Sequence, residues 1–357
     1  MTTPQETRTR GRRRMIWSAV IILCGALVLP LSGYVYVAIN EAIAATSAAE
    51  QQQKNPRANY WRAVREGNEG YTAASGPYTT SVLIQNGGQN WRQLRNGPVI
   101  STLSWLMALM LLGLGAYYAL RGPVKLSPPP SSRTIERWTL NERVLHWYTA
   151  TLFLILAVTG FSLMLGRALL IPWMGLNGFG AWANFATLIH NYLGPFFIIG
   201  VVLEIILWVR QAIPKKVDIE WFKAGGGYFG GHAHPSAEKL NAGEKIFVFW
   251  IATVVCGITV SISGVLLDFP NLNFSREALQ SANLFHGVSA IIYMTIIFMH
   301  MYLGSFGVQG ALDAMTSGRV SVEWAKQHHD LWYEEARRQG TLEERPAGRP
   351  ATRSASE

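Results

Sequence analysis

The chain has 357 residues, of which 49% are hydrophobic and only 15% are charged. A soluble globular protein of ordinary composition carries roughly a quarter charged residues, so much of this surface must face something other than water. The composition excludes most classes of soluble enzyme and predicts an integral membrane protein. The net charge of +9 is spread over segments between apolar stretches, where basic residues usually orient a membrane protein, so we expect no nucleic-acid partner.

Cysteine chemistry is also excluded as the function. The two cysteines, Cys24 and Cys256, lie in separate apolar runs. They form no disulfide framework, no CxxC metal-binding pair and no CxxCH site for the covalent attachment of a c-type haem.

Six apolar stretches are long enough to cross a bilayer, which needs about 20 apolar residues in a helix. They predict an all-α integral membrane protein in which a four-helix bundle follows one or two N-terminal helices. The stretches cover 16–39, 99–120, 144–166, 186–209, 245–268 and 284–307.

The basic residues between these stretches predict the orientation. Two connections carry a single basic residue each, Arg167 and Arg276, so the positive-inside rule places both on the periplasmic side of a bacterial inner membrane. Residues 121–143 and 210–244 are then cytoplasmic. Both termini are cytoplasmic as well if the first apolar stretch is retained.

We divide the chain into three parts. Residues 1–130 form an N-terminal module, residues 131–335 form the four-helix bundle, and residues 336–357 form a polar cytoplasmic tail.

Within the N-terminal module, the stretch 16–39 is either a transmembrane helix or a signal peptide, because arginines precede it and small residues follow it. The polar segment 40–98 is expected to be a small periplasmic appendage with a short hairpin over 82–92, around a Gly-containing turn. A Pro-rich linker, 127–132, joins the 99–120 helix to the bundle.

Four of the eight histidines lie in the last four apolar stretches: His146, His190, His286 and His300. Ionisable residues inside a membrane are costly and are functional candidates by default. His286 and His300 are 14 residues apart on one helix, which corresponds to about 21 Å of depth with an angular offset of only about 40°. One helix therefore presents an imidazole near each membrane surface, on nearly the same face.

Each of these two imidazoles has one partner at its own depth. His190 lies near the outer surface with His286, the outer pair, and His146 lies near the inner surface with His300, the inner pair. Two bis-imidazole sites are what two b-type haems need, and Gly160, 14 residues after His146, and the other glycines near these positions would let a flat macrocycle approach the backbone.

Other interpretations of the histidines stay open at this point. A single histidine in an apolar helix is often a packing or proton-relay residue, and a chain of histidines could move protons. A copper or zinc site is disfavoured because neither pair has a third Cys, Asp or Glu ligand at its depth.

Glu204 is a further intramembrane candidate. It follows His190 by 14 residues, so it faces the haem side of its helix, where it could relay protons or pair with Arg210. The alternative is a carboxylate at a helix end that reaches towards water.

The remaining four histidines are expected to be solvated residues of the cytoplasmic loop and tail, with a cytoplasmic metal site as the alternative. They are His232, His234, His328 and His329.

The region from about 138 to 335 resembles the gamma subunit, cytochrome b556, of membrane-bound respiratory formate dehydrogenases. The resemblance covers more than half of the chain, and its last run is specific because haem binding does not require it. It rests on Glu142–Trp147 (ERVLHW), His190 with Gly194–Phe197 (GPFF), Leu240–Lys245 (LNAGEK), Leu284–Gly287 (LFHG), Phe298–Tyr302 (FMHMY), Gly318–His329 (GRVSVEWAKQHH) and Trp332–Tyr333.

The resemblance implies two haem b groups, one bound by each histidine pair. It also implies a quinone site beside the inner haem, at Asn241, Gly243 and His300, for ubiquinone or menaquinone. Asn241 has a second interpretation, because Glu244 follows it by three residues and the two would form a capping box at the start of the next helix.

The resemblance also implies partners. An iron–sulfur beta subunit would deliver electrons from a molybdenum or tungsten catalytic alpha subunit, the heterotrimers could form an oligomer, and this chain would hold no formate-oxidising residues. Two alternatives stay open: a cytochrome b subunit of a nickel-iron hydrogenase or another molybdenum oxidoreductase, and a haem-free membrane anchor or transporter.

Overall fold

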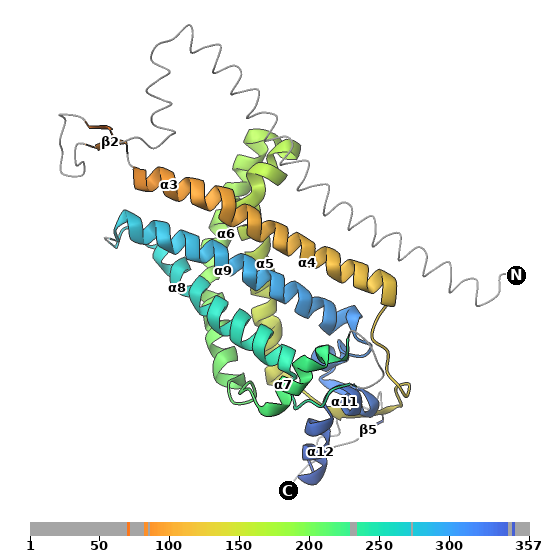
Figure 1. Ribbon diagram of the computed structural model, residues 1–357. Helices are drawn as coiled ribbons and strands as arrows, with labels where there is room; N and C mark the ends of the chain where they lie inside the picture. The colour runs from red at the N-terminus through yellow and green to blue at the C-terminus, as the bar shows by residue number, and fades with distance from the viewer. Residues whose placement is uncertain are drawn as a thin grey trace, which may run out of the picture. The chain divides into compact units, whose positions relative to one another are not determined.

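A computed structural model describes residues 70–71, 82–84, 86–228, 234–272, 274–341 and 345–346. The apolar stretch 16–39, most of the segment 40–98 and His232 therefore lie outside the described residues. What is described is almost entirely helical (Figure 1).

Among the described residues, five helical segments are long and apolar enough to cross a membrane, which confirms the last five predicted stretches. Apolar side chains on these helices stay exposed on the protein, for example Leu106 at 56% and Ile206 at 67%, as expected for surfaces that face lipid. The segments are Asn90–Arg121, Leu140–Leu169, Ile171–Trp208, Glu244–Asp268 and Arg276–Gly307.

Each membrane segment corresponds to one or more elements. The first contains most of α3 (Asn86–Leu94), then the π-helical turn η1 (Arg95–Val99) and α4 (Ile100–Arg121). The second is α5 (Leu140–Leu169) and the third is α6 (Ile171–Trp208). The fourth joins the π-helix η3 (Glu244–Cys256) to α8 (Gly257–Asp268), and the fifth joins α9 (Arg276–Tyr302) to η4 (Leu303–Gly307).

The expected hairpin over 82–92 is wrong in its second strand. The first strand exists as β2 (Val82–Ile84), but it pairs antiparallel with β1 (Gly70–Tyr71). The residues expected to form the partner strand belong to α3.

Two tertiary hydrogen bonds give the physical reason for this helix. The Trp91 indole donates to the Gln280 carbonyl at 2.9 Å, and Arg95 Nε donates to Asn283 Oδ1 at 2.6 Å. Residues 91 and 95 are one helical turn apart, so both face α9 only if the chain between them is helical. These bonds outweigh the local turn signal of the glycines.

The chain divides into two compact units. One holds the described residues up to Met110 together with Ile155–Gly194 and Thr259–Ile291, and it contains the outer histidine pair. The other holds Leu111–Leu154, Pro195–Ile258 and the residues from Ile292 onwards, and it contains the inner pair.

In the second unit a small sheet packs on a compact apolar core. The strand β3 (Arg133–Glu136) lies between β4 (Arg319–Ser321) and β5 (Arg345–Pro346), antiparallel to both. Around it lie the short helices α10 (Asp313–Thr316), α11 (Val322–His328) and α12 (Asp330–Arg338). The core consists of Leu126, Ile135, Trp138, Ala314, Val320, Val322, Trp324, Ala325 and Tyr333.

Gly318 is the residue that allows β4 to reach β3. It has a φ of 83°, which favours glycine, and a Cβ there would lie 2.6 Å from the Trp138 carbonyl oxygen. The Gly318 carbonyl in turn accepts the backbone N–H of Arg137 at 2.8 Å. Any side chain at this position would therefore separate the strand pair.

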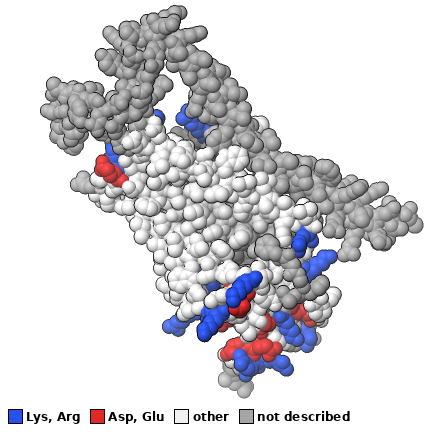
Figure 2. All heavy atoms as spheres, in the orientation of Figure 1, with Lys and Arg blue, Asp and Glu red and all other residues white. Residues whose placement is uncertain are grey.

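Charged side chains gather at the end of the second unit that carries α7 (Lys216–Lys223), α11 and α12 (Figure 2). One of them, Lys245, is fully buried, and its Nζ donates to both oxygens of Asp218 at 3.0 and 2.9 Å and to Glu238 at 2.8 Å. Because a buried charge is tolerated only when it is paired, Lys245 ties α7 to the first turn of η3.

We expect Lys245→Met to lower the free energy of unfolding by about 3–5 kcal/mol, because it leaves the carboxylate of Asp218 buried without its partner. The measurement is the thermal unfolding of the detergent-solubilised protein. Lys223→Met is the matched control, since Lys223 pairs with Glu220 on the same helix but both are mostly exposed. Equal shifts for the two variants would contradict the prediction.

His329 is a second buried group of this unit, with only 1% of its surface exposed. Arg137 Nη2 lies 3.1 Å from its Nε2, and its Nδ1 lies 2.6 Å from the Glu238 carbonyl oxygen. A guanidinium can only donate, so Nε2 accepts and Nδ1 carries the single proton. Burial, together with the charge of Arg137, lowers the pKa of His329 to about 4.

This neutral histidine makes stability fall as the pH falls. In the unfolded chain His329 binds a proton below its usual pKa of about 6.5, whereas in the folded protein it stays neutral down to about pH 4. Stability is therefore lost as the pH falls from 6.5 to about 4. The charged or titratable groups close enough to affect this imidazole electrostatically also include Glu244, Asp330 and the half-buried His328. We expect a loss of up to about 2 kcal/mol from this group between pH 7 and pH 5.

The measurement is thermal unfolding as a function of pH, with His329→Asn as the comparison. The asparagine can accept from Arg137 without titrating, so its stability should change less over this pH range. An unchanged pH dependence would contradict the prediction.

Candidate functional site

The outer pair is brought together by α6 and α9. His190 comes from α6 and His286 from α9, and their ring centroids lie 6.1 Å apart with an angle of 74° between the ring planes. Residues nearly a hundred positions apart in the chain thus face each other within the first unit.

Each ring of the outer pair has a hydroxyl at its Nδ1. Thr159 Oγ1 lies 2.9 Å from Nδ1 of His190, and Ser263 Oγ lies 3.0 Å from Nδ1 of His286. The carbonyl oxygen of Val260 is also 3.1 Å from Nδ1 of His286. The Nδ1 atoms are therefore occupied by the protein, and Nε2 is the nitrogen available to a ligand.

Glycines flank both rings of the outer pair. A Cβ at Gly160 would lie 3.0 Å from Cε1 of His190, and a Cβ at Gly264 would lie 3.4 Å from Cε1 of His286. Gly160 thus serves the close approach of an imidazole, whereas a Cβ at Gly194, a second glycine near this pair, would meet no heavy atom of the protein within 4 Å.

The inner pair has nearly the same separation. His146 on α5 and His300 on α9 have ring centroids 6.3 Å apart, with an angle of 62° between the planes. The Nδ1 atom of His146 is buried and has no hydrogen-bond partner among the described residues. The inner pair therefore differs from the outer pair in how its rings are anchored.

Both separations fit a metal held between two imidazoles. Metal–imidazole nitrogen bonds are about 2 Å long, and two such bonds plus the distances from nitrogen to ring centre put the centroids about 6 Å apart. Among the described residues, no group of three or more His, Cys, Asp or Glu side chains could hold a metal ion. Two histidines per site are what a haem iron takes as axial ligands.

Asn241 caps the helix that begins at residue 242 and continues as η3, as one of its two interpretations predicted. Its Oδ1 accepts the Glu244 N–H at 2.9 Å, and the Glu244 carboxylate accepts the Asn241 N–H at 2.8 Å. A Cβ at Gly243 would lie 3.0 Å from Trp221 and 3.2 Å from Asn241 Oδ1. Glycine at 243 therefore keeps the cap and the tryptophan in contact.

The Glu244 carboxylate links the cap to the charged groups around the inner pair. It receives Arg137 Nη2 at 3.2 Å and lies within electrostatic reach of His300. Arg137 is also stacked over the Trp138 and Trp324 rings at 5.2 and 4.7 Å. A capped helix start, an ion pair and one histidine of the inner pair thus meet in the second unit.

Glu204 is buried, with 8% of its surface exposed. Its carboxyl group is hydrogen-bonded to Thr149 and has Tyr293 as an electrostatic neighbour. It forms no ion pair with Arg210, although both residues are described, so the pairing considered from the sequence is wrong. A buried carboxyl group beside two hydroxyl-bearing side chains can accept and release a proton, so the proton-relay interpretation stays open.

The remaining histidines are less solvated than expected. His329 is buried, and His234 and His328 are half-buried, with ring centroids 4.8 Å apart. Burial, the largest cause, lowers the pKa of His328 to about 3. The segment 319–329 packs onto β3 and Arg137, which was not expected when His328 and His329 were predicted to be solvated.

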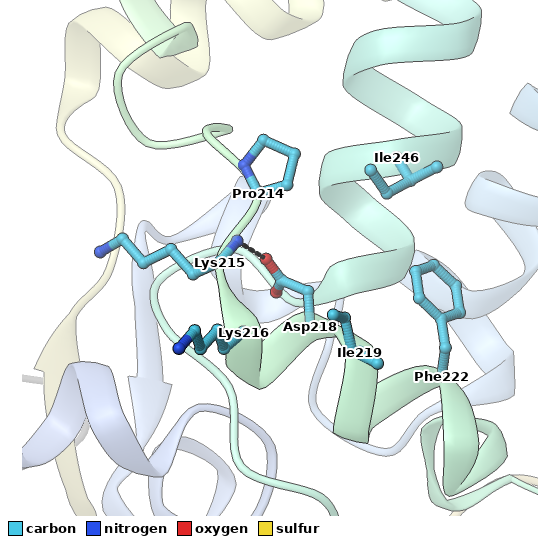
Figure 3. Close-up of a pocket in the computed structure, with 7 residues that line it drawn as sticks. All are labelled: Pro214, Lys215, Lys216, Asp218, Ile219, Phe222 and Ile246. Carbon is cyan, nitrogen blue, oxygen red and sulfur yellow. Dashed lines mark hydrogen bonds between the residues drawn. The ribbon is translucent and has the colours of Figure 1, made fainter.

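A surface hollow of about 540 Å³ lies at the junction of α7 and η3 (Figure 3). Ile219, Phe222 and Ile246 form its apolar side, and the Asp218 carboxylate accepts the backbone N–H of Lys215 at 2.7 Å beside it. None of the residues predicted for quinone lines this hollow.

Comparison with known proteins agrees with this architecture. The chain is 28% identical over 208 residues to the cytochrome b556(Fdn) subunit of the nitrate-inducible formate dehydrogenase of Escherichia coli K12, covering 57% of this chain and 92% of that protein. It is 28% identical over 207 residues to the cytochrome b556(fdo) formate dehydrogenase subunit of the same strain, covering 57% and 94%. A formate dehydrogenase cytochrome b556 subunit of Haemophilus influenzae is 29% identical over 197 residues, covering 54% and 79%.

A family model described as prokaryotic cytochrome b561 matches residues 137–318, just over half of the chain. That range contains all four intramembrane histidines and the caps and charged groups around the inner pair. The chain belongs to the prokaryotic cytochrome b561 family.

Proposed function

We propose that this chain is the membrane cytochrome b subunit of a respiratory formate dehydrogenase. It would transfer electrons from a periplasmic iron–sulfur subunit, through two b haems, to membrane quinone, with protons taken from the cytoplasm. The observation that carries the proposal is the presence of two histidine pairs with ring centroids 6.1 and 6.3 Å apart. The formate dehydrogenase names of the similar proteins support the choice of complex.

The outer pair, His190 and His286, would hold one haem b, and the inner pair, His146 and His300, would hold the other. When bound, the haems supply one-electron transfer. The chain's own contribution is to fix the imidazole rings, to surround them with apolar helices and to keep water away. This environment, together with the hydrogen bonds to the ligands, sets the reduction potentials.

Quinone would be reduced beside the inner pair, at Asn241, Gly243 and His300. A quinone needs two electrons and two protons to become a quinol, and a hydrogen-bond donor at each carbonyl. The cap uses only Oδ1 of Asn241, so the amide N–H₂ group keeps its capacity to donate to a quinone carbonyl. Glu204 is our candidate for relaying a proton from the cytoplasmic side.

The partners follow from the same proposal. They are an iron–sulfur beta subunit and a molybdenum or tungsten alpha subunit that oxidises formate, so this chain needs no formate-oxidising residues of its own. A nickel-iron hydrogenase could use a similar cytochrome b. Co-purification from native membranes separates these two complexes, because recovery of a nickel-iron subunit in place of the alpha subunit would reject our proposal.

We expect the purified protein to give a b-type reduced-minus-oxidised spectrum that reports two haems. His190→Ala or His286→Ala should remove one haem, and His146→Ala or His300→Ala should remove the other, because each haem loses one axial ligand. The measurement is haem content per chain together with a redox titration of the remaining absorbance band. Loss of the same haem from His190→Ala and His300→Ala would contradict the pairing.

Substitutions at Asn241 separate the cap from quinone binding. Asn241→Ser and Asn241→Asp retain a side-chain acceptor for the Glu244 N–H and are good caps. Neither has the amide N–H₂ donor: an aspartate carboxylate has no hydrogen to donate, and the serine hydroxyl lies one bond closer to the backbone. We expect both to keep thermal stability while quinone reduction falls roughly tenfold or more, a transition-state loss of about 1.4 kcal/mol.

Asn241→Ala is the companion variant, and it should lose about 1 kcal/mol of stability as well, because the cap is gone. The measurements are the unfolding temperature and the rate of quinone reduction in the whole complex. Normal quinone reduction in the serine and aspartate variants would leave Asn241 with the cap alone.

A further inference from the structure

We propose that Thr159 and Ser263 are positioning residues of the outer pair. By accepting the Nδ1–H of His190 and His286, their hydroxyls would turn both Nε2 atoms towards one iron. They would also hold the outer haem at a lower reduction potential than the inner haem. This inference rests on the proposed function, since it requires haem at both pairs.

The direction of these hydrogen bonds follows from the helices. A hydroxyl has one hydrogen to donate, and Thr159 Oγ1 lies 2.8 Å from the carbonyl oxygen of Ile155 one turn earlier. Ser263 Oγ lies in the same way 2.5 Å from the carbonyl oxygen of Thr259. With their hydrogens donated to the backbone, both hydroxyls accept from the imidazoles.

Both rings of the outer pair are thereby fixed in one tautomer. Nδ1 carries the proton and Nε2 carries the lone pair that an iron needs. A backbone carbonyl reinforces this at each ring: that of Val260 lies 3.1 Å from Nδ1 of His286, and that of Leu156 is hydrogen-bonded to His190. Gly160 and Gly264 lie against Cε1 of the two rings, which leaves each ring room in this orientation.

The inner pair lacks this arrangement at one of its ligands. Nδ1 of His146 is buried without an acceptor among the described residues. An acceptor on Nδ1–H makes an imidazole more basic, and a more basic ligand stabilises ferric over ferrous iron, which lowers the reduction potential. The outer haem is therefore the weaker oxidant of the two, so an electron moves favourably from the outer haem to the inner one.

The experiment is an optical redox titration of the double variant Thr159→Val and Ser263→Ala in the whole complex. Valine keeps the shape of threonine, and the two substitutions remove the hydroxyl acceptors while leaving the backbone carbonyls of Leu156 and Val260 in place. We expect the lower of the two midpoint potentials to rise by about 59 mV, which corresponds to a tenfold change in the equilibrium constant for one-electron reduction. The higher midpoint should not move.

Thr253→Val is the matched control. Its hydroxyl also donates to the backbone of its own helix, to Val248 at 3.0 Å, but it contacts no histidine ring of either pair. This variant should leave both midpoints unchanged. The pair Thr159→Ser and Ser263→Thr, which retains both hydroxyls, should keep the wild-type midpoints and haem content.

The outcomes distinguish the two proposals. A wild-type complex without a b-type spectrum would reject the proposed function itself. Two normal haems whose midpoints do not shift in the double variant would overturn only the role of Thr159 and Ser263. If the double variant lost the outer haem, the hydroxyl-retaining variant would decide: wild-type midpoints there would support the proposal, and loss of haem there too would overturn it.

Discussion

The cost of placing an imidazole inside apolar helices governs the whole site. Each ring has two nitrogens, and either of them left without a partner in a low-dielectric environment is costly. In the outer pair, Thr159 and Ser263 each provide a hydrogen-bond partner for one nitrogen of a ring. The second nitrogen of each ring stays available, and the two ring centroids lie at a separation that suits one metal between them. Leaving this second nitrogen without a partner costs free energy, and a metal bound between the two rings would offset that cost. Binding of the metal would therefore stabilise the fold as well.

The same constraint applies where α5 and η3 begin, on the side of the inner pair. Thr139 and Glu142 cap α5 reciprocally, at 2.8 and 3.3 Å, and Asn241 and Glu244 do the same for η3. At both helix N-termini the glutamate also forms an ion pair, Glu142 with Lys239 and Glu244 with Arg137. Caps that carry charge in this way place polar groups beside the half-buried histidines of the inner pair. A quinone head group needs such polar groups for its protons and apolar ones for its ring.

The spacing of His286 and His300 was enough to predict which histidines pair, because helix geometry and depth leave each only one partner. The roles of Thr159 and Ser263 could not be predicted. A hydroxyl in an apolar helix usually bonds its own backbone, and only the tertiary structure decides which one also meets a ring. Burial of His329 was missed for a related reason: its partner, Arg137, directly follows β3 and lies nearly two hundred residues earlier in the chain. The local sequence predicts which face of a helix a residue occupies, whereas contacts between segments distant in the chain determine the charges and hydrogen bonds around that residue.

The two pairs share one helix and one separation, yet their surroundings differ in kind. Among the described residues, the outer rings are hydrogen-bonded to helical hydroxyls and backbone carbonyls, and Asp268 is an electrostatic neighbour of His286. Arg137 and Glu244, which pair with each other, are both electrostatic neighbours of His300 in the inner pair. A site that only passes electrons needs fixed ligands and little else. A site that also reduces a quinone must accommodate protons and therefore needs groups that can carry charge. This asymmetry between the pairs supports the proposed function, in which electrons would leave the chain together with protons beside the inner pair.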